Sequence, residues 1–288
     1  MTIEHLYKGH EKDLGDGFRV RRLLPGHPQR TVGPFIFFDH FGPTEIAAGA
    51  GFDVRPHPHI GLATVTYLFE GAMMHRDSLG SVQRIEPGAI NWMTAGRGIV
   101  HSERATDDNR NRAWRCHGLQ LWVALPAEDE ETDPAFHHHP ADSLPEWRAD
   151  AVTLRLMVGT AERRQSPVRV FSPMAYVDAL WERDGAWIIP PEHAERAVYP
   201  VAGKIAIDGQ PIDAGRMALL AAGEPVRVEA SVGARAVLIA GAPLEGYRHI
   251  WWNFVSSRRE RIEQAKADWA AERFAPVPGE IERIPLPD

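Results

Sequence analysis

Four residues whose side chains commonly bind metal ions occur as two short pairs. His57 and His59 form the first pair, and His101 and Glu103 form the second. Side chains two positions apart on a β-strand point to the same face, and the prolines on both sides of His57 favour an extended backbone there. If the two strands are neighbours, three imidazoles and one carboxylate converge. This set suits a divalent iron, nickel, copper, manganese, zinc or cobalt ion and leaves one or two coordination positions open.

The alternative is that these side chains are hydrogen-bonded residues of a β-sandwich without a metal. A single His-x-His pair is weak support for a metal site. Here a second pair with the same spacing follows a Gly-Arg-Gly turn at 96–98. Two pairs of strong ligands, each on one face of a predicted strand, favour metal binding over the purely structural interpretation.

The strands that must position these residues are predicted from the surrounding pattern. Residues 51–125 consist of short apolar or alternating segments separated by Gly, Pro and Asp turn signals, without a useful stretch of helical periodicity. This pattern is typical of an antiparallel sandwich or barrel. A similar pattern resumes at residue 151. The fold class is therefore expected to be all-β.

The two halves of the chain share a weak repeat. Residues 67–88 and 199–215 both begin with Tyr-x-x-x-Gly and end in an Ile-x-x-Gly turn, as two copies of one β-barrel unit would. At the positions of the four candidate ligands, the second copy has Ile189, Pro191, Val228 and Ala230. Glu192 and His193 lie nearby, but no further histidine follows before His249. We expect one metal site, in the first half.

A chain of 288 residues is long enough for two domains. Residues 126–150 are polar and charged and form the best candidate linker. They include three consecutive histidines, 137–139, which could bind a metal. We expect a structural or solvated loop instead, because contiguous side chains of an extended chain cannot all face one point. We predict an N-terminal metal-binding barrel at 1–140 and a C-terminal metal-free barrel at 141–288.

An amphipathic helix is predicted near the end of the chain, at about 257–273. Ser257 and Glu260 have the spacing of a capping box, and prolines 276 and 278 would end the helix. Four apolar residues recur at helical spacing on one face, namely Ile262, Ala265, Trp269 and Ala270. We expect this helix to dock on a β domain.

The first turn of this helix is rich in arginine, at Arg258, Arg259 and Arg261. These positive charges oppose the helix dipole. We expect them to pair with acidic side chains of the same chain. A surface for a protein partner is the alternative.

The net charge of the chain does not favour nucleic acid or anionic lipid as a partner. With 32 basic and 39 acidic residues the net charge is 32 − 39 = −7, which gives no general attraction to nucleic acid or to anionic lipid. No apolar run approaches the roughly 18 residues that span a membrane, and the N-terminus has no apolar signal core.

The only cysteine, Cys116, lies in an apolar strand-like run and is expected to be a packing residue. We expect a cytoplasmic monomer.

Several of these segments together resemble the pirin family of the cupin superfamily. They are HPHIGLATVTYLFEG at 57–71, HRDSLG at 75–80, TAGRGIVHSE at 94–103 and HGLQLWVALP at 117–126, with GPFIFFDH at 33–40. The resemblance is specific over about 20–126 and looser over 150–245. It implies a bicupin, in which two antiparallel jelly-roll barrels lie face to face. It also implies iron in the N-terminal barrel, bound by His57, His59, His101 and Glu103, with iron(II) as the expected metal.

One position departs from the wider cupin pattern. Many cupins have a glutamate a few residues after the His-x-His pair, whereas this chain has Ala63. Ala63 has the same parity as His57 and His59, so we expect it to point inward and to leave Glu103 as the only carboxylate at the metal.

The resemblance implies an activity like that of quercetin 2,3-dioxygenases, which open the central ring of a flavonol with O₂. Glu103 would act as the general base for the flavonol hydroxyl. By parity, Val65, Tyr67 and Met93 would line an apolar pocket for this aromatic substrate. The alternative is a non-enzymatic regulator of transcription or metabolism that binds protein partners and senses redox state through its iron. A zinc isomerase of phosphosugars finds no support, since no cluster of basic residues marks a phosphate site.

Overall fold

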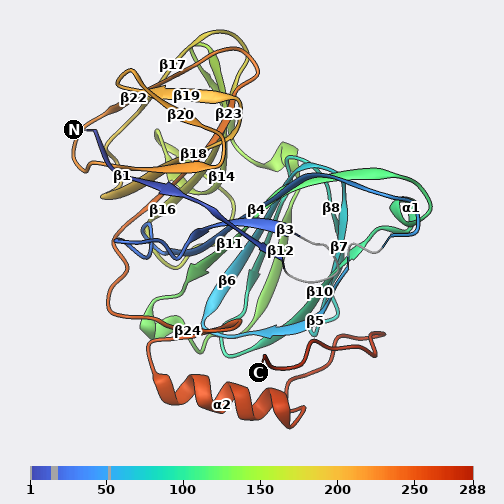
Figure 1. Ribbon diagram of the computed structural model, residues 1–288. Coiled ribbons are helices and arrows are strands. Elements are labelled where there is room, and N and C mark those ends of the chain that lie inside the picture. The colour runs from blue at the N-terminus through green and yellow to red at the C-terminus, as the bar shows by residue number, and fades with distance from the viewer. Residues whose placement is uncertain (1, 14–18, 51–52, 288) are drawn as a thin grey trace. The chain divides into compact units, whose positions relative to one another are not determined.

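The protein is described by a computed structural model that covers residues 2–13, 19–50 and 53–287 (Figure 1). Strands dominate it, which confirms the predicted all-β class. In the described residues there are two α-helices, α1 (Asp107–Arg110) and α2 (Arg259–Ala270), and two short 3₁₀ turns at Ala127–Asp129 and Ala141–Ser143. Neither α-helix is long and apolar enough to cross a membrane.

The residues group into two compact units that do not follow the chain in a simple order. Unit 1 combines Met1–Lys12, Arg21–Asp39 and Asp142–Leu244, and unit 2 combines Asp13–Val20, His40–Ala141 and Glu245–Asp288. A central division after Ala141 lies next to the sequence-based boundary at residue 140. Segments from both ends of the chain nevertheless belong to the opposite unit. The division into an N-terminal barrel at 1–140 and a C-terminal barrel at 141–288 remains a proposal.

Unit 1 contains two antiparallel sheets. The first has the order β1-β21-β18-β23-β16-β14-β13, with β15 beside β14, and the second has the order β17-β22-β19-β20. The strands are β1 (Ile3–Lys8), β13 (Glu146–Ala149), β14 (Val152–Ala161), β15 (Arg164–Gln165), β16 (Met174–Trp181), β17 (Gly185–Ile189), β18 (Glu195–Ala202), β19 (Lys204–Ile207), β20 (Gln210–Asp213), β21 (Arg216–Leu220), β22 (Val226–Ala230) and β23 (Arg235–Gly241). β1 belongs here because it pairs with β21 along its length.

The interior of unit 1 is packed with apolar side chains. Ile189 and Val228, which occupy two of the positions compared with the candidate ligands, are both fully buried in one hydrophobic cluster with Trp187. Burial of such side chains stabilises the unit by about 1.5–3 kcal/mol each. In the described residues of unit 1 no group of three metal-binding side chains converges.

Unit 2 holds a four-stranded sheet in the order β5-β10-β7-β8 and most of a larger sheet in the order β12-β9-β6-β11-β4-β3-β2. The strands of these two sheets are β2 (His10–Asp13), β3 (Arg19–Leu24), β4 (Phe35–Ile46), β5 (Val54–His59), β6 (Leu62–Glu70), β7 (Met73–Asp77), β8 (Val82–Ile85), β9 (Ile90–Thr94), β10 (Ile99–Ala105), β11 (Trp114–Ala124) and β12 (Ala135–His139), of which β2, β3 and β4 include residues of both units. A separate two-stranded sheet pairs β24 (His249–Trp251) with β25 (Phe254–Ser256). The candidate ligands thus lie on two neighbouring strands of the smaller, four-stranded sheet.

A glycine turn separates β5 from β6. Gly61 has a φ of 69°, and a Cβ at this position would lie 2.0 Å from the carbonyl oxygen of Val255. Only glycine fits such a close approach without strain. After this turn the chain leaves the smaller sheet and enters the larger one, so the alternation of side chains in β5 does not continue into β6.

The helix α2 is shorter than predicted. Ser257 does not cap it: the helix begins after Arg258, and the backbone N–H and hydroxyl of Ser257 donate instead to Glu130. Ile262, Ala265 and Trp269 are buried as expected, in a cluster with Ile60, Val100 and Phe254, whereas Ala270 is exposed. The prediction that α2 docks on a β domain is confirmed, and that domain carries β5 and β10. Figure 1 shows the helix beside β24.

Two further predictions about polar segments can be compared with the structure. The arginines Arg258 and Arg261 both form ion pairs with Glu131, so they pair with acidic residues of the same chain. The histidine tract 137–139 is not a loop, because it forms edge strand β12 against β9. His138 alternates with its neighbours and its Nδ1 lies 2.7 Å from Oδ1 of Asn91.

Candidate metal centre

β5 and β10 are antiparallel neighbours and bring three imidazoles together. In the ladder, His101 lies opposite His57 and Ile99 lies opposite His59. The ligand atoms of His57, His59 and His101 all lie within 4.8 Å of one another, and the three rings are buried. The ring centroid of His101 is 4.3 Å from that of His57 and 5.0 Å from that of His59. A divalent cation can bind to such a group.

Hydrogen bonds orient two of the rings for this role. Nδ1 of His57 lies 2.9 Å from the carbonyl oxygen of Arg55, and Nδ1 of His59 lies 3.2 Å from that of Asn253. A carbonyl oxygen only accepts, so each Nδ1 carries the proton and donates it. Nε2 of both rings is left with a lone pair, which is how metal-binding histidines are usually held.

His101 and Glu103 have buried polar atoms that need a partner. Within the described residues, neither ring nitrogen of His101 has a hydrogen-bond partner, and neither does Oε2 of Glu103. Nδ1 of His101 lies 3.4 Å from Oε1 of Glu103. Buried polar atoms without partners are costly to fold. A metal ion would satisfy them, so the residues present fit the metal that the sequence suggests.

Burial sets the protonation of the group. It lowers the pKa of His57 to about 4, despite the hydrogen bond to Arg55, and it lowers the pKa values of His59 and His101 well below the usual range. Burial also raises the pKa of Glu103 to about 8, against the attraction of neighbouring Arg104. The three imidazoles are therefore neutral near pH 7 and have lone pairs available for a cation.

The sequence reasoning assigned no role to His75 and Asp77 on β7. Asp77 lies opposite His101 and His75 opposite Glu103 in the β7–β10 ladder. Nε2 of His75 is 2.9 Å from Oδ2 of Asp77, and the His75 ring is 5.3 Å from the His101 ring, centroid to centroid. Although burial alone would raise it, the pKa of Asp77 is lowered by hydrogen bonds from His75 and Ser81. His75 and Asp77 have the same i, i+2 spacing as the other two pairs, but a role for them becomes visible only with their cross-strand partners on β10.

The register of β6 corrects the predicted pocket. Thr64 lies opposite Met93 on β9 and opposite Trp122 on β11. The Trp122 ring contacts the His59 ring at 5.2 Å. Side chains opposite one another share a face, so Thr64, Met93 and Trp122 lie on the side of the imidazoles.

Ala63, Val65 and Tyr67 alternate with Thr64 and therefore point to the other face of the sheet. The prediction that they point toward the metal was wrong, because the turn at Gly61 resets the alternation. Met93 keeps its predicted place. With Ala63 facing away, the position that faces the imidazoles after the turn is Thr64.

The face that meets the imidazoles is partly polar. Thr66 donates to Oε1 of Gln120 across β6 and β11 at 2.9 Å. Farther from the imidazoles the interior becomes apolar, with Leu68, Met73 and Cys116 in one cluster. Burial raises the pKa of the Cys116 thiol to about 12, which agrees with a packing role rather than a reactive one.

A buried ion pair supports the segment that holds His59. Nε of Arg248 lies 2.8 Å from Oε1 of Glu130, and both side chains are almost fully buried. Glu130 also accepts hydrogen bonds from Ser256 and Ser257. These bonds fix β25, which directly follows Asn253, whose carbonyl oxygen orients His59.

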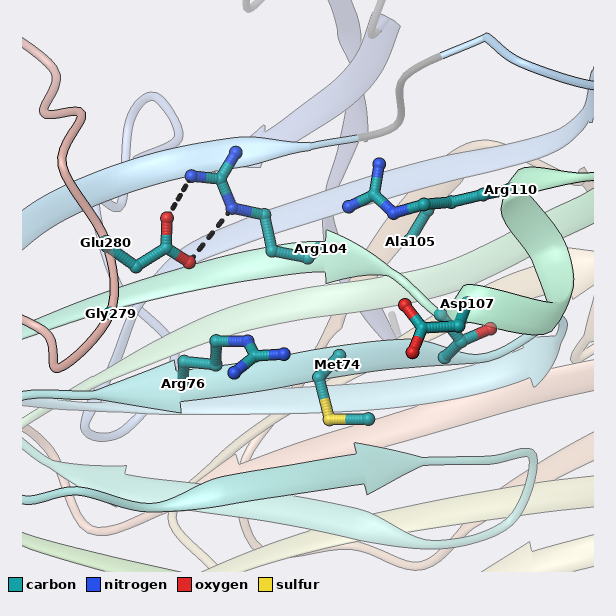
Figure 2. Close-up of a pocket in the computed structure, with 9 residues that line it drawn as sticks. Met74, Arg76, Arg104, Ala105, Asp107, Arg110, Gly279 and Glu280 are labelled. Atoms are coloured by element: carbon teal, nitrogen blue, oxygen red, sulfur yellow. Dashed lines mark hydrogen bonds and ion pairs between the residues drawn. The ribbon is translucent and has the colours of Figure 1, made fainter.

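A cavity of about 320 Å³ lies on the outer face of the β5-β10-β7-β8 sheet. Its walls include Arg76 and Arg104, which alternate with His75 and Glu103 and so point away from the imidazoles. Figure 2 shows Glu280 of the C-terminal segment bound to Arg104. Ser102 donates to the same carboxylate at 2.9 Å. These interactions with Glu280 stabilise β10 on the face opposite the imidazoles, so the cavity is separate from the metal centre.

Comparisons with known proteins agree with this architecture. The Pirin family model matches residues 17–123, and the model of the Pirin C-terminal cupin domain matches residues 176–275. A "Pirin-like protein" of Caulobacter vibrioides is 47% identical over 99% of this chain and 100% of its own length. The crystal structure of a quercetin 2,3-dioxygenase from Acinetobacter baumannii is 36% identical, with a TM-score of 0.92, over 99% of this chain and 95% of that one. The chain is thus a bicupin and belongs to the pirin family.

Proposed function

We propose that this protein is a metal-dependent dioxygenase that cleaves quercetin-type flavonols with O₂. The proposed ligands of the mononuclear metal are His57, His59, His101 and Glu103, and iron(II) is the proposed metal. The observation that carries the proposal is the convergence of three buried, neutral imidazoles, of which His101 has no hydrogen-bond partner for either ring nitrogen among the described residues. Similarity to the quercetin 2,3-dioxygenase of A. baumannii supports the choice of reaction.

When bound there, the metal would supply a Lewis acid that favours the ionised form of the flavonol 3-hydroxyl and an electron donor for O₂. The protein itself would orient the metal-binding side chains and the substrate. Hydrogen bonds to the carbonyl oxygens of Arg55 and Asn253 keep the His57 and His59 rings in place. The substrate would bind at a coordination position that the four protein ligands leave open.

Glu103 is the proposed general base. A cation beside it favours the carboxylate form over the protonated form that burial imposes. The carboxylate accepts the proton of the 3-hydroxyl when the flavonol binds and returns a proton to the product after ring opening. The 3.4 Å contact between Oε1 of Glu103 and Nδ1 of His101 supports this role, and Ala63, which faces away, adds no carboxylate there.

Met93 and Trp122 are the proposed walls for the flat substrate. Both share the face of Thr64 that meets the imidazoles, and the Trp122 ring already stands edge-on to His59. Large aromatic and sulfur-containing side chains bind aromatic ligands well and exclude water from the reacting ring. Val65 and Tyr67, on the opposite face, are not part of this pocket.

The test is O₂ uptake by iron-loaded protein with quercetin, compared with an anaerobic sample and with His101→Ala. The proposal predicts quercetin-dependent O₂ consumption and release of carbon monoxide by the wild type alone. If metal-loaded wild type consumes no more O₂ than His101→Ala, the dioxygenase proposal fails, and a regulatory role for the same metal centre becomes the better interpretation.

A further inference from the structure

His75 and Asp77 form a hydrogen-bonded pair that the proposed ligand set does not use. On β7 they lie directly opposite the two ligands of β10, with Asp77 facing His101 and His75 facing Glu103. Residues paired in this way have Cβ atoms about 4.5–5.5 Å apart. Both side chains are buried, Asp77 completely. The pair therefore belongs to the interior around the metal centre.

Asp77 determines which nitrogen of His75 carries the proton. Oδ1 of Asp77 accepts the backbone N–H groups of Leu79 at 2.9 Å and Ser81 at 3.0 Å. Oδ2 is left for His75, whose Nε2 lies 2.9 Å away. A carboxylate only accepts, so Nε2 donates to it, and in the neutral ring Nδ1 is an acceptor.

Nδ1 of His75 is held ready for a ligand. It has no hydrogen-bond partner among the described residues and, unlike the ring nitrogens of His101, it is not closed off from solvent. The imidazole stacks on the Phe136 ring, with centroids 4.1 Å apart and an angle of 11° between the planes. Phe136 thus fixes the plane of the ring, and Asp77 fixes its rotation within that plane.

We propose that His75 is a substrate-contacting residue whose Nδ1 accepts a hydrogen bond from a flavonol hydroxyl other than the 3-hydroxyl. This inference rests on the proposed function and narrows its substrate class to polyhydroxylated flavonols. An acceptor that the bound ligand covers discriminates against a ligand without the matching hydroxyl, because the acceptor then loses its water partner and is left unpaired.

The experiment compares two ligands that share the 3-hydroxyl. Quercetin has further hydroxyl groups and 3-hydroxyflavone has none. Their dissociation constants are measured without O₂ on metal-loaded wild type, His75→Phe and His137→Phe. Phenylalanine keeps the stacking on Phe136 and removes both nitrogens, while exposed His137 is the matched control. Elemental analysis of each variant shows whether the metal is retained.

The wild type is expected to bind quercetin more tightly than 3-hydroxyflavone. His75→Phe should weaken quercetin binding about 5- to 10-fold, leave 3-hydroxyflavone within about twofold, and retain the metal, and His137→Phe should match the wild type. An unchanged preference in His75→Phe, no preference in the wild type, or loss of metal from His75→Phe would each overturn the inference.

A second measurement reads the tautomer directly. ¹⁵N NMR of zinc-loaded wild type should show the His75 proton on Nε2. Asp77→Asn should move it to Nδ1, because the asparagine oxygen can keep both turn hydrogen bonds while its NH₂ group donates to Nε2. A proton on Nδ1 in the wild type would refute the assignment.

These results separate the inference from the proposed function. His75-dependent binding without O₂ consumption would keep the inference and remove the dioxygenase. Quercetin turnover with a binding preference that ignores His75 would do the reverse. If the wild type binds neither flavonol, both are overturned.

Discussion

His101 lies directly opposite His57 on the neighbouring strand, and the centroids of their rings are 4.3 Å apart. Two neutral imidazoles at this distance stabilise each other little. Both are neutral because burial lowers their pKa values. Their arrangement is understandable if a cation lies between their lone pairs, and the following predictions test that explanation.

Glu103 is predicted to be needed for tight metal binding. Glu103→Ala removes the proposed carboxylate ligand and should weaken binding of a divalent metal at least about tenfold. The matched control is His193→Ala in unit 1, where Nε2 of His193 lies 3.0 Å from the carbonyl oxygen of Thr160. Isothermal titration calorimetry with Zn²⁺ measures both. Equal affinity of Glu103→Ala and wild type would mean that three histidines suffice.

Metal affinity should rise with pH. Without metal, the pKa of Glu103 is raised from 4.5 to about 8, so its carboxyl is protonated between these values in the folded protein. The metal must displace that proton, whereas the pKa of His57 is about 4 and its ring is already neutral above pH 5. Binding at pH 6 should therefore release about one proton, and binding at pH 9 only about a tenth of a proton.

Calorimetry in two buffers with different ionisation enthalpies measures this proton release. By the same linkage, the stability that the protonated Glu103 gives to the metal-free protein is complete below pH 4.5 and is lost as the pH rises to about 8. Proton release that does not vary between pH 6 and pH 9, or that is absent from wild type and Glu103→Ala alike, would contradict the account.

Glu130 is predicted to be a major source of stability in unit 2. Glu130→Ala leaves the buried Arg248 guanidinium unpaired and removes the acceptor for Ser256 and Ser257. Loss of one partner of a buried ion pair costs about 3–5 kcal/mol. Thermal unfolding should show a large decrease in Tm. Glu131→Ala removes a more exposed acid beside it and should cost less than about 1 kcal/mol. Similar effects of both changes would refute this ranking.

Ala63→Glu tests the corrected register of β6. The new carboxylate would point away from the imidazoles into a fully buried position. It should lower Tm strongly, because an unpaired buried charge is costly, and it should not increase metal affinity. Tighter metal binding by Ala63→Glu would show that this position faces the metal after all.

Much of the fold was predictable because the relevant signals are local. Turn residues and short apolar segments indicated the strands, and the i, i+2 pairs of His57 with His59 and of His101 with Glu103 indicated the chemistry. That the strands of the two pairs are neighbours was a condition of the sequence analysis, and the pairing of β5 with β10 meets it. The filled interior of unit 1 followed from Ile189 and Val228 at the positions compared with ligands.

Other features depend on long-range contacts that local patterns do not record. The alternation rule failed at Ala63 because the turn at Gly61 moves the chain between sheets. Ser257 matched a capping box, but the buried carboxylate of Glu130 takes its hydrogen bonds. The histidine tract became β12 because β9 offered an unpaired edge. His75 and Asp77 were overlooked because their role depends on their cross-strand partners rather than on their own spacing.

The most direct test of the metal centre is the metal content of untagged protein, measured by elemental analysis on wild type and His101→Ala prepared in parallel. The account predicts about one divalent metal ion per wild-type chain and less than about a tenth of that in the variant. Equal metal content in the two proteins, or wild type that stays metal-free after incubation with Fe²⁺ under anaerobic conditions, would contradict it.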